Sequence, residues 1–578
     1  MKDKIAELLK KAVREIDTAH EVSPGLISAL KVDINKDRSR GDLSCSIAMP
    51  LSKALHRNPR QVAEDLCAKL AGLEGIERIE IAGPGFLNFF LDHDYTVRAL
   101  ERMCDDPRLG VELCAAPKIT VVDYSAPNVA KEMAVHHLRS TVIGDALVRV
   151  LEFLGHQVIR ANHIGDWGTQ FGMLIAYLEE VENSSGQGMD LSDFEAFYRQ
   201  AKERYDNDED FAVRARRYVV QLQGGDEYCL GMWRKLVNLT MTQNQALYHR
   251  LDVTLSEGDI MGESLYNEML PGIVEDLIER GIAVEDHGAI VVYLPQFKNK
   301  EGQVLGNIVR KQDGGYLYTT TDIACIKYRV DKLKAQRIIY VVDSRQHQHL
   351  LTVWEIARKA GYAPEDVVLE HCPFGMMLGK DGRPFKTRSG GTVKLRDLLD
   401  EAEERVSRLL SERGSNFEGA QRQEVVHNIA IGAVKYADLS KNRNTDYVFD
   451  WDLMLSFEGN TAPYLQYAYS RIRSIFRKAA TTPGAITLTD KAEEELAAKL
   501  LSFPATVTAV GSKCQPHLLC TYLYELSEVF MSFYESCPVI KEGVPLSVQQ
   551  SRLKLCELTS AVLRRGLDLL GIKVMEMM

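Results

Sequence analysis

Apolar residues recur at three- and four-residue steps between residues 138 and 154, which predicts a helix that ends at Gly155. A short apolar run, 119–124, precedes this helix, and a second run, 157–161, follows it. A strand, a helix and a strand in this order are typical of a parallel α/β sheet. The polar residues of this unit fall at one place in the sequence.

Those polar residues lie at the turn from the first strand into the helix, at Asn128, Lys131, His136 and His137. Ligands of open α/β sheets bind at the carboxyl ends of strands, and a helix N-terminus favours anions. The turn is therefore placed for a phosphate-bearing ligand, although adjacent histidines at a helix start are more often solvated. The chain has neither a Walker motif nor Gly-x-Gly-x-x-Gly after a strand, so neither Walker-type hydrolysis nor dinucleotide binding is predicted.

The hydrophobic pattern elsewhere divides the chain into regions. Residues 1–110 predict an α+β module in which two strand-like runs, 76–82 and 86–91, flank a Gly-Pro-Gly turn. Strand-like runs return at 289–293, 315–320 and 337–342, and beyond residue 395 only helical periodicity remains. We expect an N-terminal module at 1–110, an α/β domain at 111–395 with a helical insertion at about 179–285, a helical connecting region at 396–457 and a helical domain at 458–578.

Length and composition narrow the class of protein. A chain of 578 residues is too long for one core, and it has no apolar run of about 18 residues that would span a membrane. The N-terminal segment predicts an amphipathic helix rather than a signal peptide. The 11 cysteines include no Cys-x-x-Cys pair, so we expect reduced thiols in the cytoplasm, with neither a disulfide framework nor a zinc knuckle. The net charge of −11 argues against a generic nucleic-acid coat, but a local basic surface would suffice for binding.

A basic, glycine-rich loop occupies residues 379–392 and carries Lys380, Arg383, Lys386 and Arg388. Such a loop is most often a solvated surface. It could also be a mobile clamp on a polyphosphate, since arginine and lysine stabilise charge on transferring phosphates and loops can close over a bound substrate.

Carboxylates follow three of the strand-like runs, at Asp123, Asp322 and Asp343. A single carboxylate in this position is usually a cap or a turn residue. Several of them at one sheet edge, beside Tyr318 and Gln346, could form a pocket for a cation. A guanidinium suits such a pocket because its planar set of donors binds carboxylates bidentately.

Aromatic and basic residues alternate in the predicted helix at 459–473, which includes Tyr464, Tyr467 and Arg471. Most of these tyrosines would be buried in an ordinary helix. The alternative is a surface that stacks unpaired bases and holds backbone phosphates, as proteins do when they bind single-stranded RNA loops.

Several long stretches in the same order resemble the class I arginyl-tRNA synthetases of the bacterial type. The resemblance implies an α/β Rossmann-type catalytic domain with a helical insertion, an N-terminal α+β module that contacts tRNA, and an all-α C-terminal anticodon-binding domain. It covers essentially the whole chain, and it is carried by residues 125–140, 162–170, 315–324, 343–349, 432–438 and 457–463.

The resemblance also implies a reaction. ATP and L-arginine would give arginyl-adenylate and pyrophosphate in a step that needs bound tRNA, and the arginyl group would then pass to the 3′ end of the arginine-specific tRNA. Magnesium would accompany ATP, and no metal bound by the protein itself is expected. A cytoplasmic monomer is the expected form.

Site residues follow from the resemblance, position by position. The arginine substrate would be held by Asp123, Ser125, Asn128, Tyr318, Asp322 and Gln346. ATP would be bound by Pro127, Asn128, Lys131, Ala134, His136, His137 and Lys386, with Lys131, His136, His137, Lys386 and Arg388 as catalytic residues, and tRNA would be contacted by Tyr464, Tyr467 and Arg471.

The chain departs from the family pattern in two places. Residues 385–389 are not Lys-Met-Ser-Lys-Ser, and the resemblance implies that Lys131 compensates. The class signature His-x-Gly-His appears as Ala134-Val135-His136-His137. Ala134 in place of the first histidine removes a hydrogen-bond donor, and His136 in place of the glycine adds a side chain. Three interpretations stay open: His136 takes over the missing role in an active enzyme, the geometry of bound ATP is altered, or the chain is a weakened or inactive homologue that still binds tRNA.

Overall fold

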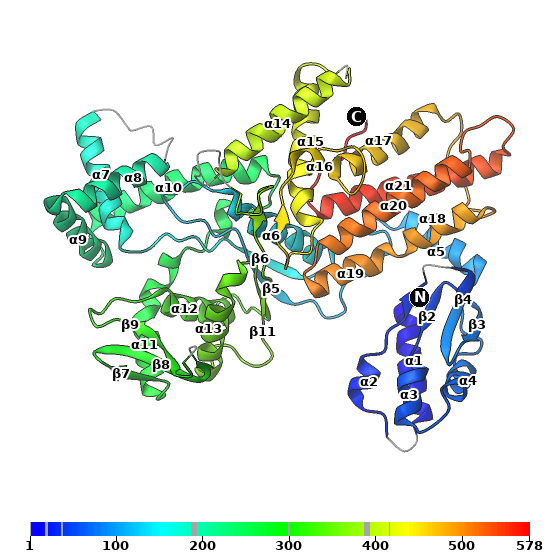
Figure 1. The fold of residues 1–578 in the computed structure, drawn as a ribbon, viewed down its shortest axis with the longest axis horizontal. Helices are drawn as coiled ribbons and strands as arrows, with labels where there is room; N and C mark the ends of the chain where they lie inside the picture. The colour runs from blue at the N-terminus through cyan, green and yellow to red at the C-terminus, as the bar shows by residue number, and fades with distance from the viewer. Residues whose placement is uncertain are drawn as a thin grey trace. The chain divides into compact units, whose positions relative to one another are not determined.

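The computed structural model describes residues 2–17, 21–35, 38–185, 194–298, 301–385, 393–414 and 417–578 (Figure 1). By its contacts the chain divides into two compact units, each described below by itself. The first unit comprises residues 1–110, 479–502 and 529–558, and the second comprises 111–478, 503–528 and 559–578. In the described part of the chain, no helix combines the length and the apolar character needed to cross a membrane.

A four-stranded antiparallel sheet with the order β1-β2-β4-β3 forms part of the first unit. The predicted strands at 76–82 and 86–91 are confirmed as β3 and β4, and the turn between them contains Gly83 and Gly85, both with positive φ. Helices α1 and α4 pack together and contribute to the core beside this sheet. The bounds are β1 (Asp33–Ile34), β2 (Leu43–Cys45), β3 (Ile76–Ala82), β4 (Phe86–Leu91), α1 (Lys2–Ile16), α2 (Pro24–Ser28), η1 (Arg38–Arg40), α3 (Ala48–Ala54), α4 (Pro59–Lys69), α5 (His93–Asp105) and α18 (Lys491–Leu501).

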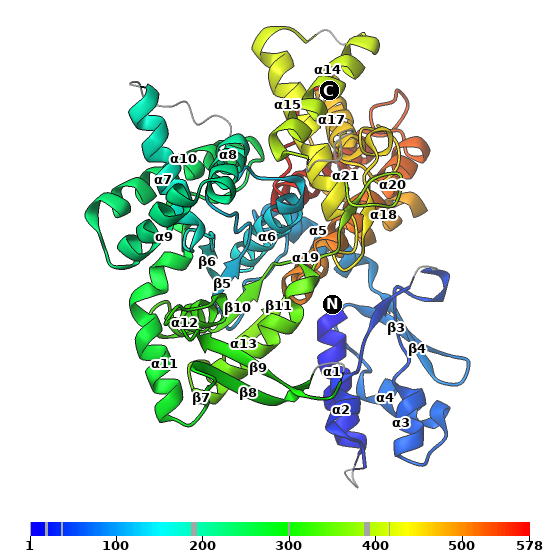
Figure 2. The ribbon, with the colours of Figure 1, turned by 60° about the vertical axis from the view of Figure 1, so that its left-hand side comes forward.

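The second unit is built around a parallel sheet with the order β11-β10-β5-β6 (Figure 2). Its strands are β5 (Ile119–Asp123), β6 (Gln157–Ala161), β10 (Arg337–Tyr340) and β11 (Val368–His371). The register pairs Asp123 with Ala161 on one side and with Tyr340 on the other, so three strands end at the same level. Helix α6 (Val135–Phe153) connects β5 to β6, which confirms the predicted strand–helix–strand unit. The polar turns after these strands therefore share one sheet edge.

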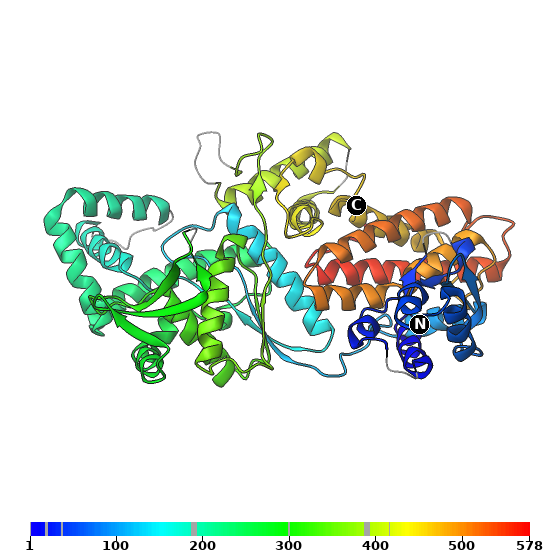
Figure 3. The ribbon, with the colours of Figure 1, turned by 60° about the horizontal axis from the view of Figure 1, so that its bottom comes forward.

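A helical group follows β6 (Figure 3). It has its own core, which includes Phe171, Phe197 and Phe211. Its elements fall largely on the predicted insertion, while the domain boundaries themselves remain predictions. The bounds are α7 (Gln170–Ser185), α8 (Phe194–Asn207), α9 (Glu209–Gln223), α10 (Glu227–Arg250), η2 (Glu257–Asp259), η3 (Glu263–Met269) and α11 (Leu270–Glu279).

The strand-like runs beyond the insertion have different outcomes. Residues 289–293 begin β8 (Ala289–Lys298), which pairs with β7 (Ala283–Asp286) and β9 (Val304–Arg310) in a separate antiparallel sheet. The strand predicted at 315–320 is wrong, because α12 (Tyr318–Asp331) begins there. The threonines at 319–321 favour a strand locally, but burial of Ile323, Ala324 and Ile326 on the helix face outweighs that preference.

The remaining elements of the second unit are mostly helical, as the periodicity predicted. One two-residue strand, β13 (Tyr447–Val448), interrupts the predicted helical connecting region, because it pairs with β12 (Met377–Leu378) and is too short to give a sequence pattern. Helices α20 and α21 contribute residues to both units. The bounds are η4 (Ser344–Gln346), α13 (His347–Lys359), α14 (Leu395–Glu412), α15 (Gly419–Leu439), α16 (Trp451–Met454), α17 (Ala462–Lys478), α19 (Phe503–Lys513), α20 (His517–Ser536) and α21 (Leu546–Leu569).

Candidate active site

The turn between β5 and α6 has an unusual backbone. Ser125, Ala126 and Ala130 have positive φ, which side chains other than glycine rarely adopt. Side-chain oxygens hold this conformation: Ser140 Oγ accepts from Ser125 N over 2.9 Å, and Asn162 Oδ1 accepts from Ala126 N over 3.1 Å. Strained backbone that is fixed in this way is common at functional sites.

Ser125 and Asn128 occupy different environments within this turn. Ser125 is buried, with its Oγ 2.8 Å from Tyr248 Oη, and Thr141 donates to the same oxygen over 2.9 Å. Asn128 is exposed and lies against Gly165, where a Cβ atom would come within 2.3 Å of Asn128 Oδ1. The buried Pro127 accepts from Gly165 N over 3.2 Å. Glycine at 165 thus lets the two loops approach each other closely.

His137 stands in the first turn of α6 and is neutral. Its Nδ1 accepts a hydrogen bond from Ala134 N over 3.1 Å, so in the neutral ring the proton is on Nε2. Burial and the neighbouring His136 lower the pKa of His137 to about 3. His137 therefore offers an uncharged N–H donor at the N-terminus of α6.

His136 is exposed, and its ring centroid lies 4.0 Å from that of His137. Partial desolvation and the nearby positive charge of Arg345 lower the pKa of His136. Ala134 is buried and has no side-chain donor. The two altered signature positions thus face different surroundings.

The cationic residues predicted for the phosphate end are only partly within the described residues. Lys131 is exposed, with its Nζ 5.0 Å from the centroid of the Tyr198 ring. Lys386 and Arg388 lie outside the described residues. The chain directly after them pairs with the signature segment, since Val135 N donates to Val393 O over 3.1 Å.

The predicted cation pocket is centred on Asp322 in α12. His349 Nε2 lies 2.6 Å from Asp322 Oδ2, and the ring of the exposed Tyr318 packs edge-on against His349 at 4.8 Å between centroids. Gln346, at the end of η4, is exposed. The structure therefore brings Asp322 and Tyr318 together through His349.

Glu263 lies in the same environment, although no local sequence pattern indicates its role. Burial, followed by the charges of Asp322 and Asp166, raises the pKa of Glu263 to about 7. His163 joins this group, with its Nε2 3.9 Å from Asp322 Oδ1. Glu263 follows no strand-like run, so the strand-end criterion missed it, whereas His163 lies in the glycine-rich polar turn after β6.

The other two strand-end carboxylates have arginine partners within the protein. Asp123 is 4% exposed, and Arg329 Nη2 donates to its Oδ2 over 2.6 Å. Arg345 donates to both oxygens of Asp343, each over 2.8 Å. Partial burial would raise the pKa of Asp343, but these hydrogen bonds and the positive charge of Arg345 lower it overall. Asp322 therefore faces the pocket with more of its carboxylate exposed than Asp123.

Arg139, close after His137 on α6, has a structural role. The side chain is 1% exposed, and its Nε lies 3.1 Å from Asp438 Oδ2 on α15. Arg139 lies beyond the first turn of α6, on a side of the helix that faces the core. Its guanidinium is therefore committed to joining α6 with α15.

The tyrosines of α17 differ in exposure. Tyr467 is 39% exposed, Tyr464 is half-buried against Tyr524, and Tyr469 is buried and donates to Glu576 over 3.0 Å. Arg471 is exposed. Tyr467 lines an open pocket of about 680 Å³, which also contains Arg405, Arg408, Arg413, Trp451 and Phe457.

Known family models match three consecutive parts of the chain. Residues 103–451 match "tRNA synthetases class I (R), catalytic domain". The parallel sheet of the second unit and the site at its edge therefore belong to a class I synthetase catalytic domain. Residues 1–91 match "Arginyl tRNA synthetase N terminal domain", and residues 465–578 match "DALR anticodon binding domain".

Individual proteins with long matches agree with these models. An arginine–tRNA ligase of Edwardsiella ictaluri is 60% identical over 93% of this chain and 94% of its own length, and one of Pectobacterium carotovorum is 58% identical over the same shares. The solved arginyl-tRNA synthetase of Plasmodium falciparum has a TM-score of 0.86 and 30% identity, covering 100% of this chain and 99% of that one. The chain therefore belongs to the arginyl-tRNA synthetase family.

Proposed function

We propose that this protein ligates L-arginine to its tRNA at the expense of ATP. A carboxylate oxygen of arginine attacks the α-phosphorus of ATP and releases pyrophosphate. A terminal hydroxyl of tRNA then attacks the carbonyl carbon of the arginyl-adenylate and releases AMP. The observation that carries this proposal is the pair of carboxylates, Asp322 and Glu263, in one pocket, because together they would favour a cationic side chain.

The guanidinium of the substrate would bind at Asp322 and Glu263. Two carboxylates can accept several of its five N–H donors, and the bound cation would favour the ionised form of Glu263. Tyr318 and Gln346 would complete this end of the pocket. Since Asp123 is buried against Arg329, its predicted role in arginine binding would operate through the shape and charge of the pocket floor.

The amino-acid end of arginine would lie along the turn after β5. Asn128 is exposed there and can offer amide donors and acceptors. Ser125, buried in its hydroxyl cluster, would position the turn and align the carboxylate of the substrate with ATP. This assignment places the reacting carboxylate next to the N-terminus of α6.

The triphosphate would lie at that helix N-terminus, where backbone N–H groups and the helix dipole favour anions. His137 Nε2–H would donate to a phosphate oxygen, and Lys131, Lys386 and Arg388 would share the charge of the leaving pyrophosphate. Pro127, Ala134 and His136 would line the nucleotide. Magnesium would arrive with ATP, and the phosphate oxygens would supply ligands of the kind that it prefers.

The anticodon-binding part of the chain would contact tRNA through α17 and its surroundings. Tyr467 is exposed beside Arg405, Arg413 and Trp451, a combination that suits unpaired bases and phosphates. Tyr464 and Arg471 would extend this surface. The pocket also contains Glu412, Asp452 and Glu458, so support for RNA binding there comes from the exposed aromatic rings rather than from an excess of positive charge.

The altered signature does not change the proposed reaction. The relatives reported above are named as ligases, and no comparison supports the alternative of an inactive tRNA-binding homologue. Among the interpretations of Ala134 and His136, we favour the one in which His136 takes over the missing role in an active enzyme, because its ring adjoins that of His137. We further propose that the enzyme works as a monomer in the cytoplasm, which light scattering and cell fractionation would test.

Citrulline provides a direct test of the proposed pocket, since it has nearly the shape of arginine and no positive charge. We expect the enzyme to charge tRNA with arginine at a kcat/KM at least roughly a hundredfold above that for citrulline, because the carboxylates of Asp322 and Glu263 would lose their cationic partner. Equal charging with both amino acids would contradict the proposal.

A further inference from the structure

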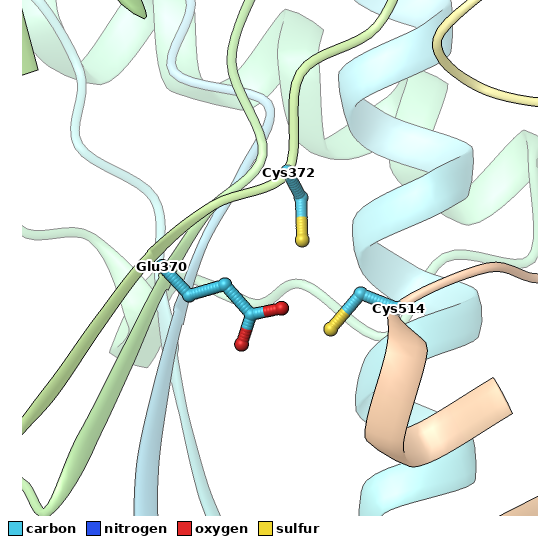
Figure 4. Close-up of side chains that lie close together, drawn as sticks. All are labelled: Glu370, Cys372 and Cys514. Carbon is cyan, nitrogen blue, oxygen red and sulfur yellow. The ribbon is translucent and has the colours of Figure 1, made fainter. Parts of the chain in front are cut away.

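Three side chains with metal-ligand chemistry converge beside the parallel sheet, and none of them belongs to the proposed substrate site. Glu370 lies on β11, Cys372 follows that strand, and Cys514 follows α19. Their ligand atoms all lie within 4.8 Å of one another, and Figure 4 shows the three side chains pointing into one space. Both cysteines are 0% exposed.

The backbone around these residues is well anchored. Cys372 N donates to Tyr340 O over 2.8 Å, which continues the pairing of β11 with β10. Cys514 has a φ of +52° just beyond the end of α19, a position where glycine is the usual residue. A cysteine that adopts this conformation directs its thiol toward Cys372 and Glu370.

Arg337, the first residue of β10, contacts two of these side chains and α19. Its Nη2 donates to Glu370 Oε2 over 2.6 Å and to Cys514 Sγ over 3.2 Å, and its Nη1 donates to Gly511 O over 3.3 Å. Hydrogen bonds of this kind orient the ligands of a metal and tune its binding. The guanidinium therefore fixes Glu370 and Cys514 relative to each other.

We infer that Cys372, Cys514 and Glu370 bind one Zn²⁺ ion, which would link the sheet to α19. Thiolate and carboxylate ligands suit Zn²⁺, and three protein ligands leave a fourth position for water. Binding releases the proton of each thiol. The two charges of the ion then balance the two thiolates, and Arg337 balances Glu370, so the buried site is neutral overall, as a low-dielectric interior requires.

A disulfide between the same cysteines is the main alternative. It would join the two sulfurs with loss of two protons and two electrons to an external oxidant such as a low-molecular-weight disulfide. Attack on such an oxidant needs an accessible thiolate, and both thiols are buried. A metal ion needs only entry along the partly exposed Glu370, whose side chain is 27% exposed.

The test uses the full-length protein, reduced and freed of metal with a chelator, and then titrated with Co²⁺ in the absence of oxygen. We expect thiolate-to-cobalt charge-transfer absorption that saturates at one equivalent and disappears when one equivalent of Zn²⁺ is added. Zn²⁺ should also raise the midpoint of thermal unfolding, because an ion that binds only the folded chain stabilises it. Absence of thiolate–cobalt absorption in the folded protein would overturn the proposal.

Matched variants separate this site from other cysteines. The Cys372→Ser/Cys514→Ser variant should lose the absorption and the stabilisation by Zn²⁺, while Cys114→Ser, which changes a partly exposed thiol elsewhere, should keep both. Circular dichroism shows whether each variant is folded. If the reduced protein binds no metal and instead gains a 372–514 disulfide on treatment with oxidised glutathione, the cluster is a redox pair and the metal proposal is wrong.

Discussion

Arg329 Nη2 donates to Asp123 Oδ2 over 2.6 Å, and the two side chains are 0% and 6% exposed. This ion pair joins α12, which carries Asp322, to the end of β5, where the strained turn begins. Both halves of the proposed substrate pocket therefore depend on one buried pair. Because a buried charge without its partner is costly, the pair should be essential to the stability of the pocket.

Replacement of Arg329 by Met should lower the free energy of unfolding of the second unit, which holds the parallel sheet, by about 3–5 kcal/mol. The replacement leaves the Asp123 carboxylate buried and unpaired. Urea unfolding followed by near-UV circular dichroism measures this loss. Lys327→Met on the same helix, which removes an exposed pair with Asp331, should cost at most about 1 kcal/mol. The double variant Arg329→Met/Asp123→Asn should recover much of the loss, and additive losses would contradict the account.

Asp322→Asn should raise the KM for arginine by roughly a hundredfold while changing the KM for ATP little, because it removes a charged partner of the guanidinium. Steady-state pyrophosphate exchange in the presence of saturating tRNA, with arginine and ATP varied in turn, gives both constants. Asp331→Asn provides the control, because Asp331 lies on the same helix and pairs with Lys327 at the surface. Equal changes in the two constants would refute the assignment of Asp322 to the arginine pocket.

The pKa of Glu263, raised to about 7, predicts a pH dependence of arginine binding. Below that pH the carboxyl is protonated and loses its attraction for the guanidinium, so the KM for arginine should rise as pH falls, by up to about tenfold per unit. A carboxyl with a raised folded-state pKa stabilises the free protein at low pH, and this contribution is lost as pH rises from 4.5 through about 7.

Glu263→Gln should remove that pH dependence and leave a uniformly high KM for arginine. The measurement is pyrophosphate exchange between about pH 5 and pH 8, with ATP and tRNA saturating at every point. A pH profile of the variant that follows the wild-type profile would assign the titration to another group, and the role proposed for Glu263 would be withdrawn.

His137→Ala should lower the rate of pyrophosphate exchange by about a hundredfold or more, because it removes a neutral donor aimed at the phosphates. The pKa of His137, about 3, keeps the ring uncharged throughout the working pH range. His136→Ala should cause a smaller loss, since that ring is exposed. Unchanged exchange in the His137 variant would show that the α6 N-terminus binds phosphate through its backbone alone.

The sequence predicted the elements that have a strong local pattern and missed those that depend on distant partners. The unit from β5 to β6 follows from its periodicity, and the turn after β5 follows from its polar residues. The helix that begins at Tyr318 does not, because local β propensity there is outweighed by tertiary burial.

Site residues divide in the same way. The sequence indicates Asp322 as a site residue because it follows a strand-like run, even though α12 begins within that run. Glu263 and the partnership of Asp123 with Arg329 needed the structure, since nothing within a few residues of either position indicates the partner. The cluster of Cys372 and Cys514 is another such case, because its members are brought together only by the packing of α19 near the sheet.

The central claim is that this chain attaches arginine to tRNA with the signature Ala134-Val135-His136-His137 as it stands. Charging of tRNA with radiolabelled arginine, measured beside the Ala134→His/His136→Gly variant, tests it most directly. We expect the unchanged protein to attach arginine to its tRNA. The amount of labelled tRNA should fall to background when ATP, the enzyme's tRNA or the protein is omitted. Tight tRNA binding without charging by the unchanged protein, together with charging by the variant, would contradict the claim.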